Sequence, residues 1–153
     1  MADDPEYGGP WLQAAVFCEK VMFEKDNVAS LIRLVDRFTI TASGVAPPEK
    51  MPPANIKIMA FLYFKAGIAR GSFEVNVVAH DPSHRVVAQL MFPMLLEGED
   101  RGAQIGAEMN LQITEDGLYW FDVLLGKRLV TRMPLRIVYQ RIIAGPGLGL
   151  PSA

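Results

Sequence analysis

Apolar and polar residues alternate with a period of two along much of this 153-residue chain, and this pattern constrains its fold more than any other feature. The alternation is clearest in SFEVNVVAH (72–80) and AQIGAEMNLQIT (103–114), and it is weaker in RVVAQLMF (85–92). Successive side chains of a strand point to opposite faces, so this period is typical of strands with one face in a core. The sequence therefore predicts a chain built mainly of half-buried strands.

The segment NIKIMAFLYFK (55–65) differs from these because it is apolar on both faces. A strand of this kind lies in the middle of a sheet, or has its outer face covered by a loop, a tail or another subunit. We expect one of these arrangements for residues 55–65.

The segment NVASLIRLVDRFTI (27–40) fits two structures, because its apolar residues suit both helical spacing and a strand interrupted by Asp36. We favour a strand, since an isolated helix is unusual in a chain so rich in strand patterns. The next stretch, SGVAPPEKMPPAN (43–55), holds four prolines. It is stiff and extended, and we expect it to cross from one sheet to the other.

Two apolar runs near the end of the chain flank Gly126 and Lys127. A pair that begins with Gly suits a two-residue hairpin of type II′. The second run contains Pro134, which has no N–H to donate to a ladder. This predicts an edge strand or a bulge at that position.

The stretch EDGLYWF (115–121) resembles the corner of immunoglobulin-type domains in Glu115, Gly117 and Tyr119, with Phe121 where those domains place a cysteine. The resemblance implies that the Tyr119 hydroxyl bonds back to the backbone of the turn while its ring packs in the core. It also implies that the antibody-type disulfide is missing, because Cys18 is the only cysteine.

These patterns predict an all-β fold, an antiparallel β-sandwich of about seven or eight strands that is immunoglobulin-like or jelly-roll-like. Residues 11–143 form its single domain. Residues 1–10 and 144–153 are rich in Gly and Pro, and we expect them to be flexible tails.

A broader resemblance covers residues 12–140. Its residues are FCEKVMFEKDNVASLIRLVDRFTI, FPMLLEGEDRG and EDGLYWFDVLLGKRLVTRMPLRIVY, which resemble an uncharacterised family of small bacterial proteins, a domain of unknown function. The resemblance implies a bacterial β-sandwich of the cytosol. It implies no particular activity, cofactor or catalytic residue.

Composition narrows the range of partners and locations. A formal net charge of -2 gives no long-range field for a polyanion, so we expect no nucleic acid partner. Cys18 has no cysteine to pair with, which favours a reducing compartment, and its apolar neighbours predict a buried thiol. No apolar run reaches the ~20 residues of a membrane span and no signal sequence is recognisable, so we expect a cytoplasmic protein.

Two loops carry residue types that bind ligands. HDPSHR brings His80, Asp81 and His84 close together, as a metal site requires, although a solvated Asp-Pro turn accounts for the same residues. LEGEDRG brings together three carboxylates, as a calcium site does: Glu97, Glu99 and Asp100. A polar crossover loop in which Arg101 pairs with an acid accounts for the same residues. We favour the turn and the crossover loop.

A candidate interaction surface follows the last strand. Three arginines of this strand point the same way: Arg128, Arg132 and Arg136. They either bind an anionic partner or protect an exposed strand edge from unwanted pairing, and we favour the protective role. Trp120 lies on the face of its strand opposite Tyr119.

We find no nucleotide-binding, metalloprotease or nucleophile motif, so we predict no cofactor and no catalysis. The sequence predicts an interaction module that binds a protein or itself; the alternative is a module that binds a small ligand, carbohydrate or lipid through loops 80–85 and 97–102.

Overall fold

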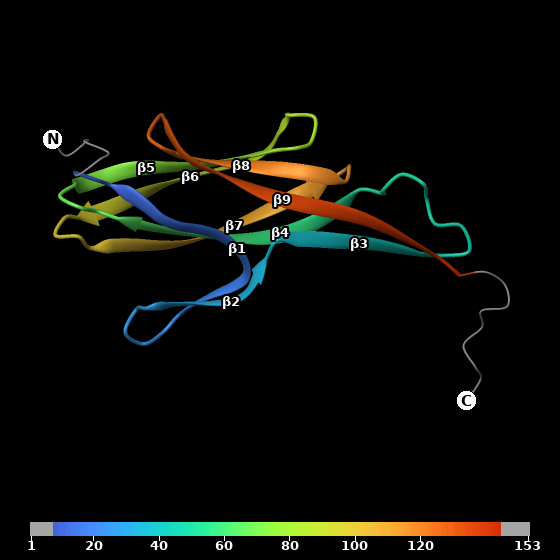
Figure 1. The fold of residues 1–153 in the computed structure, drawn as a ribbon, viewed down its shortest axis with the longest axis horizontal. Coiled ribbons are helices and arrows are strands. Elements are labelled where there is room, and N and C mark those ends of the chain that lie inside the picture. The colour runs from blue at the N-terminus through green and yellow to red at the C-terminus, as the bar shows by residue number, and fades with distance from the viewer. Residues whose placement is uncertain (1–7, 145–153) are drawn as a thin grey trace.

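The alternating segments form strands in the computed structural model, which describes residues 8–144 (Figure 1). Within these residues there are nine strands and no helix. The strands are β1 (Trp11–Phe23), β2 (Ala29–Val35), β3 (Arg37–Gly44), β4 (Ala54–Lys65), β5 (Arg70–His80), β6 (Val86–Glu97), β7 (Gly102–Ile113), β8 (Gly117–Leu125) and β9 (Arg128–Ile143). The strand prediction for 27–40 is confirmed.

The strands form two packed sheets, which confirms the predicted all-β sandwich (Figure 1). One sheet has the order β2-β1-β4-β7 and the other the order β3-β9-β8-β5-β6. Residues 8–144 form nine strands, where about seven or eight were predicted. Residues 29–44 form two strands, and the chain changes sheet at the bend of Asp36, so β2 pairs with β1 whereas β3 pairs with β9.

The strand order is that of an immunoglobulin-like fold rather than a jelly roll. Strands β1, β4 and β7 take the places of strands A, B and E, while β5, β8 and β9 take those of C, F and G. One pair departs from the predicted antiparallel arrangement, because β3 runs parallel to β9. The β8–β9 hairpin has the predicted two-residue turn at Gly126 and Lys127, with Gly126 at φ 60.

The core lies between the sheets and is built from the inward faces of the alternating strands. Val75, Val77 and Ala79 of β5 are completely buried. Phe17 of β1 and Phe121 of β8 meet across the two sheets, edge to face, with their ring centroids 4.8 Å apart. This aromatic pair links the sheets at the centre of the sandwich.

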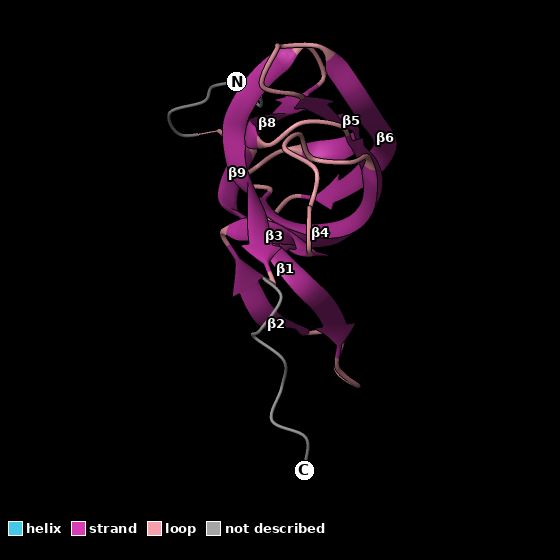
Figure 2. Cartoon of the chain, turned by 90° about the vertical axis from the view of Figure 1, so that its right-hand side faces the viewer, coloured by secondary structure: helices cyan, strands magenta, loops and turns pink. Residues whose placement is uncertain are grey.

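The outer face of β4 is covered by the β1–β2 hairpin, which curls over it and extends beyond the sandwich (Figure 2). Phe61 on that face is only 7% exposed. A methyl group added to Gly106, the partner of Phe61 in β7, would lie 3.5 Å from Cβ of Val21. The backbone N–H of Ala29 donates to Gln104 Oε1 at 3.0 Å. The apolar outer face of residues 55–65 is therefore partly covered by this chain itself, with Phe61 buried and Met59 and Tyr63 half-buried.

The proline-rich loop 45–53 leaves β3 in the five-stranded sheet and enters β4 in the other sheet, so it crosses between the sheets as predicted. The Tyr139 hydroxyl donates to the Pro48 carbonyl at 2.6 Å, and Arg141 Nη2 donates to the Pro47 carbonyl at 2.9 Å. These two bonds attach the loop to β9.

The ends of the predicted domain differ slightly from those of the structure. Gly8, Gly9 and Pro10 are buried, and the Ile68 N–H donates to the Gly8 carbonyl at 3.1 Å, so this part of the predicted tail 1–10 belongs to the sandwich. Ala144 still bonds to Gly44 at 2.9 Å. The remaining tail residues, 1–7 and 145–153, lie outside the described residues. A helix with the length and apolar character to cross a membrane does not occur in residues 8–144.

Candidate functional site

The first element of the site is the corner at the start of β8. Tyr119 is 1% exposed, and its hydroxyl donates to the Glu115 carbonyl at 2.7 Å. This is the bond that the resemblance to the immunoglobulin corner implies. Burial raises the pKa of Tyr119 above its ordinary value. The inward Tyr119 directs its neighbour Trp120 to the outer face of the sheet.

The second element is the turn between β5 and β6, which Asp81 organises. Asp81 Oδ1 accepts the backbone N–H groups of Ser83 and Arg85, both at 2.9 Å, and Oδ2 accepts Arg85 Nε at 3.0 Å. Burial alone would raise the pKa of Asp81, but these bonds and the Arg85 charge outweigh it and hold the pKa below its ordinary value. The sequence predicted a solvated turn, whereas Asp81 is 2% exposed.

The corner and the turn interlock. The Ser83 hydroxyl donates to Glu115 Oε1 at 3.1 Å. Gly117 has a φ of +129, and a methyl group at this position would lie 2.8 Å from Cγ of Pro82. Only glycine combines that backbone conformation with so close an approach. The contact fixes the end of β5 against the start of β8.

The interlocked turns bring His80 beside Trp120 on the outer face of the five-stranded sheet. His80 pairs with Trp120 in the β5–β8 register, and Trp120 pairs with Pro134 in the β8–β9 register. Asp122 lies between two basic side chains, with its Oδ2 3.4 Å from His80 Nε2 and its Oδ1 3.1 Å from Arg132 Nε. These side chains form a row across three strands.

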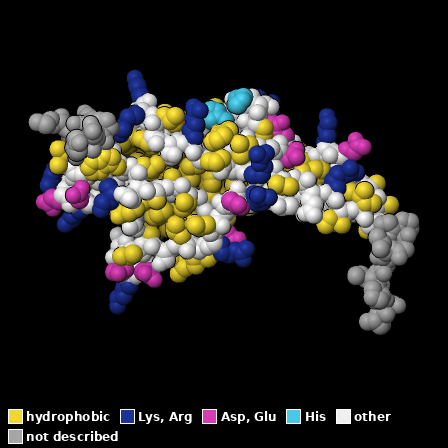
Figure 3. Space-filling model, in the orientation of Figure 1, with side chains coloured by type: hydrophobic (Ala, Val, Ile, Leu, Met, Phe, Trp, Pro, Cys, Tyr) yellow, Lys and Arg dark blue, Asp and Glu magenta, His cyan; other side chains and the backbone are white. Residues whose placement is uncertain are grey.

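The row and His84 line a cavity of about 430 Å³, with walls formed by His80, His84, Trp120, Asp122 and Arg132. In Figure 3 the two histidines lie together at the upper rim of the molecule, next to apolar side chains. The cavity combines one aromatic face with donors and one carboxylate, an arrangement that suits a partly apolar, partly polar ligand. Sequence reasoning missed Asp122, although its place two residues after Trp120 on the same face was a usable signal.

The carboxylates of loop 97–102 lie far from this cavity. His80 and Val86 pair at one end of the β5–β6 ladder, whereas Arg70 and Glu97 pair at the other. Glu97 bonds to Arg101 at 2.8 Å and Glu99 to Arg70 at 3.4 Å, while Asp100 lies in the same turn. Loops 80–85 and 97–102 therefore do not form one site. Among residues 8–144, no three His, Cys, Asp or Glu side chains are placed to hold a metal ion.

The predicted interaction surface lies along β9, which is only partly paired. Strand β8 pairs with β9 from Arg128 to Ile137, but β3 joins on the other side only from Arg136 onward. Within residues 8–144, residues 128–135 of β9 thus have a neighbouring strand on one side only. Pro134 was predicted to mark an edge strand or a bulge; β9 is an inner strand of its sheet, but Pro134 lies in this locally open edge.

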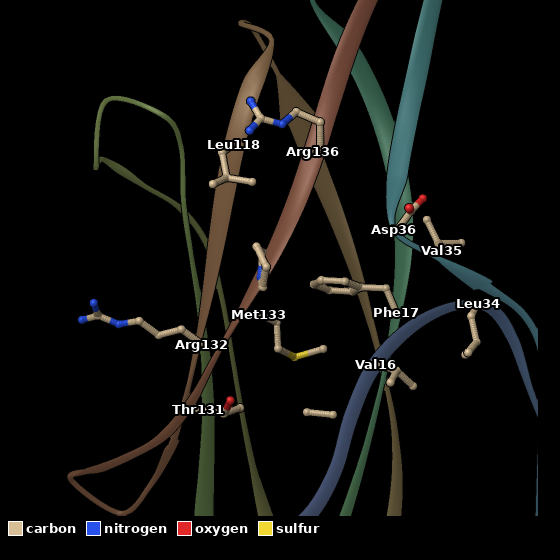
Figure 4. Close-up of a pocket in the computed structure, with 12 residues that line it drawn as sticks. Val16, Phe17, Leu34, Val35, Asp36, Leu118, Thr131, Arg132, Met133 and Arg136 are labelled. Carbon is tan, nitrogen blue, oxygen red and sulfur yellow. The ribbon is translucent and has the colours of Figure 1, made fainter.

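A groove of about 660 Å³ runs between the open edge of β9 and strands β1 and β2 (Figure 4). Phe17 and Met133 point into it, and Val16, Leu34 and Val35 form its far wall. Figure 3 shows apolar side chains across the middle of this side of the molecule. Most of the groove lining is therefore apolar, while Asp36, Thr131, Arg132 and Arg136 add polar groups to it.

The arginines lie on the other face of β9. In Figure 4, Arg132 and Arg136 extend away from Phe17, although both also border the groove. All three predicted arginines are exposed, and within residues 8–144 only Arg132 among them has an ion-pair partner. Arg128 and Arg136 are therefore available to an acidic group.

Comparisons with known proteins add little. No family model matches the chain and no curated protein matches it, so the resemblance to an uncharacterised bacterial family stays a prediction. Among solved structures, a β-glucosidase from Listeria innocua in complex with glucose is similar at 9% identity and a TM-score of 0.49, over 89% of this chain. The chain spans 17% of that enzyme. An immunoglobulin-like protein from Pseudomonas aeruginosa is similar at 11% identity and a TM-score of 0.41, over 86% of this chain and 98% of its own.

Proposed function

We propose that this chain is a non-catalytic, immunoglobulin-like binding module that recognises a protein through the β9 surface. We define the β9 surface as the open edge of residues 128–135 together with Trp120, Arg128, Arg132 and Arg136. The observation that carries the proposal is the open edge itself, which lies beside an apolar groove although β9 is an inner strand. Unpaired strand edges are sites where proteins add a strand from a partner.

The composition of the β9 surface supports a protein partner. Trp120 is half-buried and Arg132 is exposed, and Trp and Arg are residue types that dominate binding energy at protein interfaces. The only thiol of the sequence, Cys18, is buried and its pKa is raised by burial, which makes it a poor nucleophile. We further infer that the protein resides in a reducing compartment such as the cytoplasm, because a chain with one cysteine forms no internal disulfide.

The proposal is tested by capturing partners with the wild-type chain and with two variants. Trp120→Ala removes an aromatic side chain from the β9 surface, whereas Leu95→Ala shortens an exposed side chain at the far end of β6 and serves as control. We expect a protein that is retained by the wild type and by Leu95→Ala and lost with Trp120→Ala, while all three unfold at similar temperatures. A partner set that is identical for all three chains contradicts the proposal.

Self-association is a second form of this function, and light scattering coupled to gel filtration distinguishes it. We expect a monomer at tens of micromolar, because Phe61 on the outer face of β4 is already buried under the β1–β2 hairpin. A dimer that Trp120→Ala dissociates would instead mean that the chain is its own partner.

A small ligand is the second candidate, favoured by the 430 Å³ cavity beside Trp120. A sugar or another polar compound that stacks on Trp120 and bonds to His84 or Asp122 would fit its lining. Such a ligand at 100 times its dissociation constant raises the free energy of unfolding by about 2.7 kcal/mol. A thermal shift with wild type that Trp120→Ala abolishes would support this candidate, and no shift across a panel of sugars and metal ions would oppose it.

A further inference from the structure

We infer that the partner segment is an extended peptide in which apolar residues alternate with acidic ones, and that it adds as a strand to the open edge of β9. The inference rests on the proposed function, because it names what the β9 surface recognises. Three features of the structure support it: the open backbone, the apolar groove and the arginines on the opposite face.

The open backbone selects an extended guest. Beside residues 128–135, β9 has β8 on one side and no strand from the described part of the chain on the other. Successive residues of a strand direct their backbone N–H and C=O groups to alternate sides. About half of these groups in residues 128–135 therefore face the side without a neighbouring strand. A guest strand of about eight residues, ~26 Å long, matches the open stretch.

The groove selects apolar side chains on one face of that guest. Phe17 and Met133 are almost fully buried at its floor, and Val16, Val35 and Leu34 line its far side. A strand placed along β9 would direct every second side chain into this space. Apolar residues there would complete the core between the two sheets.

The arginines select acidic side chains on the other face. Residues that alternate with the groove-facing ones would lie beside Arg132 and Arg136, which extend over the outer face of the sheet (Figure 4). Arg136 has no ion-pair partner within residues 8–144. A carboxylate on the guest would pair with a guanidinium in the bidentate geometry that arginine favours.

The same arginines disfavour a second copy of the chain as the guest. Two β9 edges paired with each other would oppose rows of like charge, which destabilises cross-strand pairs. The protective role predicted for the arginines therefore applies to self-pairing, while an acidic strand is admitted.

The test uses labelled peptides and fluorescence anisotropy on the full chain. The first peptide, of about eight residues, alternates Val with Glu; the second has the same composition in grouped order, and the third alternates Val with Lys. We expect the first to bind at least about tenfold more tightly than the other two, and its binding to weaken as salt is added. Equal binding of the first two peptides, or no binding of the first, overturns the inference.

Two matched variants locate the peptide. Leu34 and Leu95 are both 68% exposed, but only Leu34 borders the groove. Leu34→Glu should weaken binding of the Val–Glu peptide about tenfold or more, while Leu95→Glu leaves it unchanged. Arg136→Glu should weaken the Val–Glu peptide and strengthen the Val–Lys peptide. If both leucine variants behave alike, the groove is not the site.

Failure of this inference is distinguishable from failure of the proposed function. A protein captured through Trp120 in the experiment above, combined with no binding of the Val–Glu peptide, would keep the function and reject the strand. Peptide binding that also protects the amides of 128–135 from hydrogen exchange would support both. Protection confined to β6 or β7 would reject the assigned edge.

Discussion

The corner at Tyr119 offers a prediction whose size follows from the structure. Tyr119→Phe removes one oxygen from a ring that is 1% exposed, so the packing of the ring is kept and only the bond to the Glu115 carbonyl is lost. A net hydrogen bond contributes about 1 kcal/mol, and a buried acceptor left without a donor costs about 1–3 kcal/mol. Glu115 is only half-buried, so water reaches part of it. We therefore expect a loss of about 1–2 kcal/mol.

Urea unfolding at neutral pH measures this loss, and Tyr139→Phe is its matched control. The Tyr139 hydroxyl also donates to a carbonyl, that of Pro48, but this bond is exposed. We expect Tyr139→Phe to cost less than about 0.5 kcal/mol, because water replaces an exposed bond. Equal costs for the two variants, or no cost for Tyr119→Phe, would refute the view that a buried corner bond stabilises the sandwich.

Three further predictions concern the corner and the turn. Because the pKa of folded Tyr119 is raised, the unfolded chain releases this proton first as pH rises above about 10, so the wild type should lose stability there and Tyr119→Phe should lose less. Gly117→Ala should cost about 1–3 kcal/mol and more than Gly71→Ala, since both glycines have positive φ but only Gly117 lies against Pro82; equal costs would contradict the contact. Asp81→Asn should lower the free energy of unfolding by about 1–3 kcal/mol at neutral pH. The low pKa of Asp81 stabilises the fold above about pH 3.9, so the stabilities of the variant and the wild type should converge as pH falls through the folded pKa. A difference that stays constant with pH would argue against a stabilising role of the Asp81 charge.

The local parts of the fold could be predicted because they depend on period and turn chemistry. Alternation identified β5, β6 and β7, and the Gly-first pair identified the hairpin at Gly126. The interruption at Asp36 was predicted, but the change of sheet there was missed, because a period reports which face a side chain takes and not which sheet it joins. The parallel β3–β9 pair and the hairpin that covers Phe61 are contacts between distant segments, which local patterns do not encode.

The candidate site divides in the same way. Trp120 and Arg132 were predicted from the alternation of their own strands. The row that joins them to His80 and Asp122 depends on the registers of β5, β8 and β9, which no single segment contains. Two loops that both carry polar ligand-type residues can lie at opposite ends of a strand pair, as loops 80–85 and 97–102 do. Only the fold decides which polar residues meet.

The open edge of β9 is the basis of the proposed binding surface, and amide hydrogen exchange of the free chain, resolved by residue, tests it directly. Strand β3 pairs with β9 from residue 136 to 143, and β8 also pairs with β9 up to Ile137. In this stretch we expect slow exchange both for the amides that face β3 and for those that face β8. Between 128 and 135, alternate amides should exchange much faster, because they face no strand. Uniform slow exchange along the whole of β9 would mean that the edge is already covered, and would contradict the proposed binding surface.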